Sequence, residues 1–321
     1  MATKFLSDFF AESKIPRTLF SVSLLSFVGK LWVFIMRDCS MSKWVSGSST
    51  NVSTIANYED FEPGSFEFEG VRRGVYKSGE GPGIIVIHEI PGLYDKVLDF
   101  ARKLNNAGYT TYLPSLIGTP GKPLTASYGL SSMAKLCVSR EFNRVAHRKE
   151  APLANWLRAL ARDCHARCGG PGVGAIGMCF SGGFALAMMA DESVIAPVLS
   201  QPSMPFGLTK KLKADVDMNL ADLPKIREHM ENHDICLLAL KFSHDSLVPT
   251  ERFDYLKSIL GDRFVGVEID SSPGNSHAIK STAHSVLASD FVDDEDHPTY
   301  KAYEKVIALF EKQLKKKSGS I

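Results

Sequence analysis

The chain alternates short apolar runs with longer amphipathic segments, and this pattern limits its fold more than any other feature. Residues 83–89 (GIIVIHE) form a continuous β-branched run, as in strands that are buried on both faces of a sheet. The other expected strands are residues 109–116, 173–178, 194–199, 235–242 and 264–269. The expected helices are residues 94–107, 151–167, 182–190, 222–231, 250–260 and 299–315. Repeated strand and helix units predict an α/β fold, a mainly parallel sheet with helices on both faces.

The first part of the chain has a different composition from the rest. Residues 19–36 are apolar except for serines and Lys30, and residues 45–57 read as a polar linker. We therefore expect an N-terminal extension over residues 1–55, followed by the α/β domain over residues 56–321. Residues 66–76 alternate and predict an antiparallel hairpin at the edge of that domain's sheet.

The composition narrows the expected partners and location. The net charge of +1 gives no indication of a nucleic-acid partner. Six scattered cysteines in a chain of 321 residues do not form a disulfide framework, which predicts a reducing, cytoplasmic location. The alternative is an anchor or other membrane contact through residues 19–36. Cys164 and Cys168 resemble half of a metal site, but no second pair with zinc spacing follows, so we expect no metal.

A strand that turns sharply into a helix presents the expected nucleophile. Residues 173–178 lead into Cys179, with Gly177 two positions before it and Ser181 two positions after it. Such a turn needs small residues at both places because the backbone folds back on itself. The helix that follows favours a thiolate at its N-terminus. We expect Cys179 to be the nucleophile, with Ser181 as the competing candidate.

An acid and a base are expected after later strands. Asp245 directly follows the run 235–242, where its carboxylate can orient an imidazole. Two histidines follow the next strand, His277 and His284. We favour His277 as the base because it lies closer to the strand end, on a loop with a Pro-Gly turn. His284 is the alternative base.

Backbone N–H groups can form an oxyanion hole beside the nucleophile. The expected donors are those of Ile90, which follows the first buried strand, and Phe180, which follows Cys179. Glu89 is a charged residue at the end of an apolar strand. We expect its carboxylate to hold the thiol proton of Cys179 in the resting enzyme.

Together these segments resemble the dienelactone hydrolase (carboxymethylenebutenolidase) family. The resemblance covers roughly residues 70–318 and rests on IIVIHEIPGL, GYTTYLPSL, GAIGMCFSGG, SHDSLVP and PGNSHAI. It implies an α/β-hydrolase fold and a Cys–His–Asp triad, with a glutamate that contacts the cysteine before substrate binds. By resemblance these roles fall on Cys179, His277, Asp245 and Glu89. The family uses no cofactor or metal, and its carboxylate-binding arginine corresponds to Arg140.

The predicted function is hydrolysis of small esters or lactones through the Cys179 thiolate. One alternative is a membrane-tethered binding module that keeps the fold without turnover. A second alternative is an acyl transferase that uses the same cysteine with an acceptor other than water.

Overall fold

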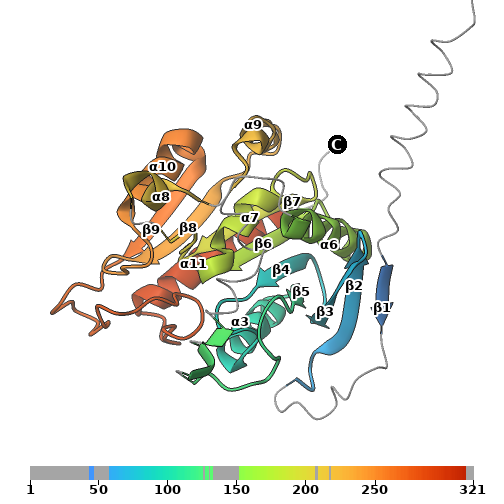
Figure 1. Cartoon of the computed structure of the whole chain (residues 1–321), viewed down its shortest axis with the longest axis horizontal. Helices are drawn as coiled ribbons and strands as arrows, with labels where there is room; N and C mark the ends of the chain where they lie inside the picture. Colours follow the sequence, from blue (N-terminus) through green and yellow to red (C-terminus); the bar gives the residue numbers. More distant parts are fainter. Residues whose placement is uncertain are drawn as a thin grey trace, which may run out of the picture. The chain divides into compact units, whose positions relative to one another are not determined.

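The described residues contain nine strands, which form one sheet in the order β1-β2-β3-β5-β4-β6-β7-β8-β9 (Figure 1). The strands are β1 (Lys43–Ser46), β2 (Glu62–Phe68), β3 (Val71–Ser78), β4 (Gly83–Ile87), β5 (Thr110–Pro114), β6 (Val173–Met178), β7 (Val194–Ser200), β8 (Leu237–Phe242) and β9 (Phe264–Ile269). The computed structural model describes residues 43–46, 58–125, 127–129, 131–132, 152–206, 209–216 and 218–315. All of them belong to one compact unit, Ser42–Ile321.

The sheet is parallel from β5 to β9 and antiparallel at the end that carries β1, β2 and β3. Every residue of β4, β5, β6, β7 and β8 is buried, as the continuous apolar runs predict. β2 and β3 pair along their length and form the predicted antiparallel hairpin, although β1 pairs outside it at the edge of the sheet. The expected α/β class with a mainly parallel sheet is confirmed.

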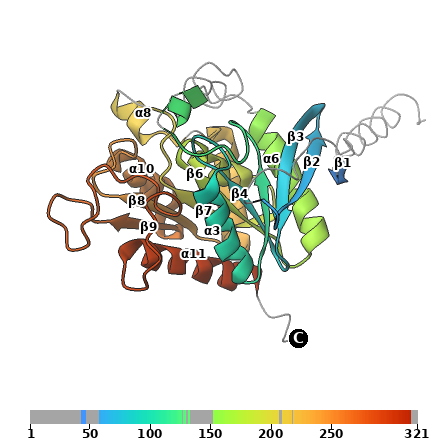
Figure 2. The ribbon, with the colours of Figure 1, turned by 90° about the horizontal axis from the view of Figure 1, so that it is seen from below.

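Helices cover the two faces of this sheet. The described α-helices are α3 (Asp95–Asn106), α6 (Pro152–Cys168), α7 (Gly182–Met188), α8 (Lys210–Ala214), α9 (Leu223–Asn232), α10 (Thr250–Leu260) and α11 (Pro298–Leu314). Helices α3 and α11 lie side by side, where the rings of Phe100 and Tyr303 meet edge to face (Figure 2). Helix α6 packs against α7 instead, and Arg158 joins them by donating to the carbonyl of Ala187 at 3.0 Å.

Strand β1 adds the outermost pairing of the sheet from a segment that the sequence places in the N-terminal extension. The Trp44 ring lies on β2 at Gly64, where a Cβ would clash with it. The same ring meets Tyr112 edge to face, with centroids 5.8 Å apart. Residues 43–46 therefore pack as part of the sheet, although the expected boundary falls at residue 55.

No helix among the described residues is long and apolar enough to cross a membrane. The apolar run at residues 19–36 lies outside the described part of the chain.

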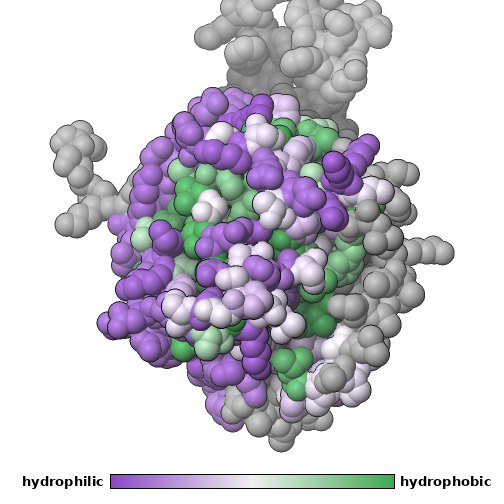
Figure 3. Space-filling model, turned by 90° about the vertical axis from the view of Figure 1, so that its left-hand side faces the viewer, coloured by the Kyte–Doolittle hydropathy of each residue, from purple (hydrophilic) through white to green (hydrophobic). Residues whose placement is uncertain are grey.

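The loops that follow β8 and β9 lie on the left-hand side of Figure 1. Seen from that side, the surface carries hydrophobic residues among hydrophilic ones (Figure 3). In open α/β sheets, the carboxyl ends of the strands are where ligands bind.

Candidate active site

Cys179 lies at the apex of the turn that joins β6 to α7. The short helix η3 (Cys179–Ser181) occupies this turn, and Cys179 has a φ of 56°, a left-handed conformation that strains a residue other than glycine. A Cβ on Gly177 would clash with the carbonyl oxygen of Ser181, and one on Gly182 would lie 2.5 Å from Cα of Pro202. The small residues are therefore required by close backbone packing around Cys179.

The hydroxyl of Ser181 holds this turn together. It is buried and lies at donor distance from two carbonyl oxygens, those of Ile87 and Met178, each at 2.9 Å. It also accepts a hydrogen bond from the N–H of Met178 at 2.9 Å. A hydroxyl engaged with main-chain groups on several sides is poorly placed to attack a substrate. This geometry favours Cys179 over Ser181 as the nucleophile.

The thiol of Cys179 has a neighbour that the sequence analysis did not single out. Sγ of Cys179 lies 3.3 Å from Oγ of Ser203, and the N–H of Ser203 donates to the carbonyl of Cys179 at 3.0 Å. Ser203 is fully buried in the loop that follows β7. Cys179 is therefore fixed to that loop through both its backbone and its side chain.

A buried arginine holds the same loop in position. Arg252, near the start of α10, donates to the carbonyl oxygens of Pro202 at 2.5 Å and Pro205 at 2.8 Å. Its Nε donates to the carbonyl of Asp215 at 2.6 Å. Hydrogen bonds from a charged donor are stronger than neutral ones, so Arg252 restrains the backbone on both sides of Ser203.

Asp245 and His284 are brought together from two different loops. Nδ1 of His284 lies 2.7 Å from Oδ2 of Asp245, and the other carboxylate oxygen accepts from the N–H of Leu247 at 2.9 Å. Burial by itself lowers the pKa of His284. The hydrogen bond to Asp245 and the interaction with Cys179 outweigh burial and raise this pKa to about 11. Nε2 of His284 is buried, and a hydrogen bond between this side chain and Cys179 is among the interactions that raise its pKa.

The structure does not bring His277 to Asp245. His277 is exposed, and its ring packs against His297 with centroids 5.5 Å apart. The preference for His277 over His284 therefore disagrees with the geometry. The connection after β9 first turns outward through a Pro-Gly loop, and only its later part returns over the sheet. Ala283 and Val286 anchor that later part in the core. These apolar neighbours are the feature of the sequence that could have indicated His284 as the base.

Glu89 lies at the centre of a buried hydrogen-bond network. Its carboxylate accepts hydrogen bonds from Tyr94, from Ser285 at 2.8 Å and from Nε2 of Gln201 at 2.8 Å. Burial raises the pKa of Glu89, and the hydrogen bond from Tyr94 and the charge of His284 offset this only in part. The described hydrogen bonds thus connect Glu89 to the segment beside His284, whereas the Cys179 thiol contacts Ser203.

Two further groups fix the loop that carries His284. The carboxylate of Asp290 accepts from the N–H groups of His284 and Ser285, each at 2.9 Å. The side-chain oxygen of Gln201 accepts from the N–H of Val286 at 3.3 Å. The contact of Gln201 joins residues 85 positions apart in sequence, which is why no local pattern indicated it.

The expected oxyanion donors occupy the turns next to Cys179. Phe180 follows it in η3, and Ile90 follows β4 in a loop held by His88. His88 is fully buried: its Nδ1 lies 2.8 Å from the carbonyl of Glu89, and Nε2 accepts from the N–H of Leu116 at 3.0 Å. Burial lowers the pKa of His88 to about 4, so this imidazole is neutral near pH 7. It therefore holds the main chain before Ile90 without adding charge.

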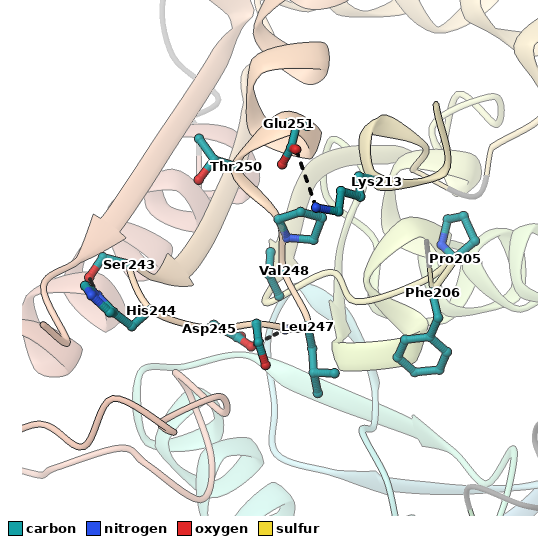
Figure 4. Close-up of a pocket in the computed structure, with 12 residues that line it drawn as sticks. Pro205, Phe206, Lys213, Ser243, His244, Asp245, Leu247, Val248, Thr250 and Glu251 are labelled. Atoms are coloured by element: carbon teal, nitrogen blue, oxygen red, sulfur yellow. Dashed lines mark hydrogen bonds and ion pairs between the residues drawn. The ribbon is translucent and has the colours of Figure 1, made fainter. Parts of the chain in front are cut away.

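A cavity of about 470 Å³ borders the acid of this site (Figure 4). Asp245 and Leu247 lie at one side of it, and the ion pair between Lys213 and Glu251, 3.8 Å apart, lies at the other. Phe206 contributes an apolar ring that is 40% exposed. The cavity thus offers a mixed polar and apolar surface next to Asp245. Arg140, the expected substrate-binding residue, lies outside the described residues.

The side chains at this site supply a thiol, an imidazole and a carboxylate. Among the described residues, no group of three or more His, Cys, Asp or Glu side chains could hold a metal ion. The chemistry that this arrangement can perform is acyl transfer through a thiolate assisted by a carboxylate-oriented imidazole.

Several solved structures share the fold of this chain. The protein titled "m3DLH" matches with a TM-score of 0.52 at 19% identity, covering 79% of this chain and 98% of its own. A dienelactone hydrolase-like promiscuous phosphotriesterase, P91, from metagenomic libraries matches with a TM-score of 0.51 at 16% identity and the same coverage. DcsB, in complex with its substrate analogue, matches with a TM-score of 0.50 at 14% identity, covering 80% of this chain and all of its own.

No curated protein gives a significant match to the chain. The model of the family described as "Dienelactone hydrolase family" matches residues 71–314, which is most of the chain and includes every described part of the candidate site. With the α/β-hydrolase fold of its structural neighbours, this match shows that the chain is a hydrolase belonging to the dienelactone hydrolase family.

Proposed function

We propose that the protein hydrolyses small esters or lactones by a two-step acyl transfer through Cys179. The observation that carries this proposal is the pairing of Asp245 with His284 beside a cysteine at a strained strand–helix turn. A carboxylate that binds one imidazole nitrogen leaves the other nitrogen directed at the nucleophile. His284, not His277, is therefore our candidate for the base.

In the first step the Cys179 thiolate attacks the carbonyl carbon of the substrate. The backbone N–H groups of Ile90 and Phe180 stabilise the oxyanion that forms. The intermediate collapses to a thioester on Cys179, and the imidazolium of His284 gives its proton to the leaving alcohol. For a lactone, the alcohol stays attached to the acyl group because the ring opens.

In the second step water hydrolyses the thioester. The neutral imidazole of His284 takes a proton from the attacking water, and Asp245 stabilises the resulting positive charge. The tetrahedral intermediate then releases the carboxylic acid and restores Cys179. Both steps need the same histidine in alternate protonation states, which the hydrogen bond to Asp245 supports.

Glu89 and Ser203 have different proposed roles around the nucleophile. Ser203 holds the resting thiol through the 3.3 Å contact between Oγ and Sγ. Glu89 orients the loop of His284 through Ser285, and its contact with the Cys179 thiol in the resting enzyme stays a prediction, as does its shift when substrate binds. Substrate selection is proposed to involve the cavity beside Asp245 and, as the family resemblance implies, Arg140.

The test is an assay of the full chain and its Cys179→Ala variant with p-nitrophenyl acetate and a set of small lactones. We expect turnover that vanishes in the variant and an acyl adduct on Cys179 by mass spectrometry. Full activity in the variant would contradict the proposal. A folded wild-type protein with neither turnover nor adduct would favour the binding module. Ester products formed with added alcohols would favour the acyl transferase.

A further inference from the structure

Two cysteines that the proposed reaction does not use lie together at the C-terminal end of α6. Cys164 and Cys168 are four residues apart, so they share one face of the helix. A Cβ placed on Gly83, the first residue of β4, would clash with Sγ of Cys164 and lie 3.3 Å from Sγ of Cys168. Both sulfurs are therefore packed against the same glycine.

This pair is separate from the proposed active site. Cys168 precedes β6 and Cys179 follows it, so the whole strand of six residues lies between them. At roughly 3.3 Å per residue, such a strand spans about 20 Å. Chemistry at the pair can therefore be measured apart from chemistry at Cys179.

The two thiols have unequal surroundings. Cys164 is fully buried, and burial raises its pKa well above the usual range. Cys168 is partly exposed, and its pKa is lowered to about 6. The hydrogen bond from Cys164 is the largest cause, and Thr110, Tyr112 and Lys77 add to it against the effect of burial. A pair with one exposed thiolate and one buried thiol resembles the dithiols of redox-active sites.

A tyrosine supplies a further donor beside Cys168. The hydroxyl of Tyr112 is buried, and its hydrogen bond to Cys168 is one of the interactions that lower the pKa of that thiol. Burial raises its pKa, and negative charge on Cys164 and Cys168 raises it further, so the hydroxyl stays protonated. Hydrogen bonds to a charged group are stronger than neutral ones, so this hydroxyl stabilises an anionic sulfur at Cys168.

We infer that Cys164 and Cys168 form an oxidation site that a hydroperoxide converts to an intrahelical disulfide. The Cys168 thiolate attacks the peroxide O–O bond and becomes a sulfenic acid, while the peroxide leaves as water after taking a proton. The Cys164 sulfur then attacks the sulfenic sulfur, and a second water leaves. In total, two thiols lose two electrons and two protons, and one hydrogen peroxide becomes two waters.

The end of α6 can adapt to such a bond. Residues four apart on a helix hold their Cβ atoms about 5–6 Å apart, whereas a disulfide needs about 3.8 Å. The last turn must therefore open, and the helix ends at Cys168, followed by Gly169 and Gly170 at positive φ. The turn also carries Arg167, which lies over the Trp44 ring of β1 at 5.6 Å. Oxidation is thus expected to loosen the docking of β1.

The experiment treats the full chain with hydrogen peroxide, blocks free thiols with N-ethylmaleimide and maps tryptic peptides. Trypsin cleaves after Arg167, so a disulfide would link the peptide of residues 163–167 to that of residues 168–210. Because the second peptide also contains Cys179, the experiment is done in the Cys179→Ala background, where Cys168 is its only thiol. We expect the linked pair of peptides, and its loss after reduction with dithiothreitol.

Two variants separate the proposed steps. In Cys164→Ser/Cys179→Ala, Cys168 should stop at the sulfenic acid and be trapped by dimedone. In Cys168→Ser/Cys179→Ala, Cys164 should stay reduced. Before oxidation, N-ethylmaleimide at pH 7 should modify Cys168 about tenfold faster than Cys164, because thiolates are the reactive form. Separate peptides with both thiols free, or Cys168 carried to the sulfinic acid while Cys164 stays free, would overturn the inference.

Discussion

Nδ1 of His284 lies 2.7 Å from Oδ2 of Asp245, a contact between residues 39 positions apart in the chain. It joins the loop after β8 to the loop after β9 at the carboxyl edge of the sheet. The contact fixes the imidazole ring and leaves the buried Nε2 atom for the interaction with Cys179. Substitutions of His284 and His277 are therefore expected to have different effects, although both residues follow β9.

The first prediction compares these two histidines. His284→Ala should lower kcat/KM for p-nitrophenyl acetate by about 10²–10⁴-fold, the usual contribution of a general base. His277→Ala should stay within about twofold, since an exposed side chain away from the triad contributes little. The measurement is steady-state kinetics, with circular dichroism to check folding. A larger loss in His277→Ala than in His284→Ala would return the base to His277.

The second prediction concerns protonation of His284. Its pKa of about 11 means that the imidazolium persists through neutral pH, because a group is protonated below its pKa. Asp245→Asn removes one of the two interactions that raise this pKa, so burial should then bring it down. By NMR, the ring protons of His284 should not titrate between pH 6 and 9 in the wild type, and in the variant their titration should move to lower pH. Identical titration curves would show that Asp245 does not set this pKa.

The third prediction tests the contact between Ser203 and the thiol. Ser203→Ala removes a neutral hydrogen bond worth about 1 kcal/mol. We therefore expect a change of about fivefold in kcat/KM and in the rate at which iodoacetamide alkylates Cys179. Ser258→Ala is the matched control, because Ser258 lies on the exposed side of α10 and bonds only to its own helix. If both variants alkylate Cys179 at the wild-type rate, the proposed role of Ser203 is wrong.

The fourth prediction concerns stability against pH. The pKa of His88 is about 4 in the folded state and about 6.5 in an unfolded chain, so the unfolded state binds the proton more tightly. Its contribution to stability is therefore complete above pH 6.5 and is lost as the pH falls through 4. Between pH 7 and 5 this loss is about 2 kcal/mol.

His88→Asn removes this titration while an amide oxygen can still accept from the N–H of Leu116. We expect the variant to be less stable than the wild type at pH 7 but to lose about 2 kcal/mol less between pH 7 and 5. Urea denaturation at the two pH values measures both quantities. Equal losses in the two proteins would mean that His88 is not held neutral by burial.

The sequence by itself determined the layered fold and the turn that carries Cys179, the proposed nucleophile. Strand and helix patterns are local, and so is the need for small residues around Cys179, where the backbone returns on itself within five residues. The position of Asp245 directly after a buried strand is equally local. These features depend on neighbours in the chain, so periodicity and turn chemistry were enough to predict them.

Only the tertiary structure decided which histidine contacts Asp245 and which side chains donate hydrogen bonds to Glu89. His277 and His284 lie seven positions apart on one long connection, and its path depends on core contacts of Ala283 and Val286. Glu89 joins Gln201 and Ser285 across the ends of several strands. Ser203 reaches Cys179 only because the sheet places β6 beside β7. Contacts of this kind form when distant segments pack, and a local sequence pattern does not encode them.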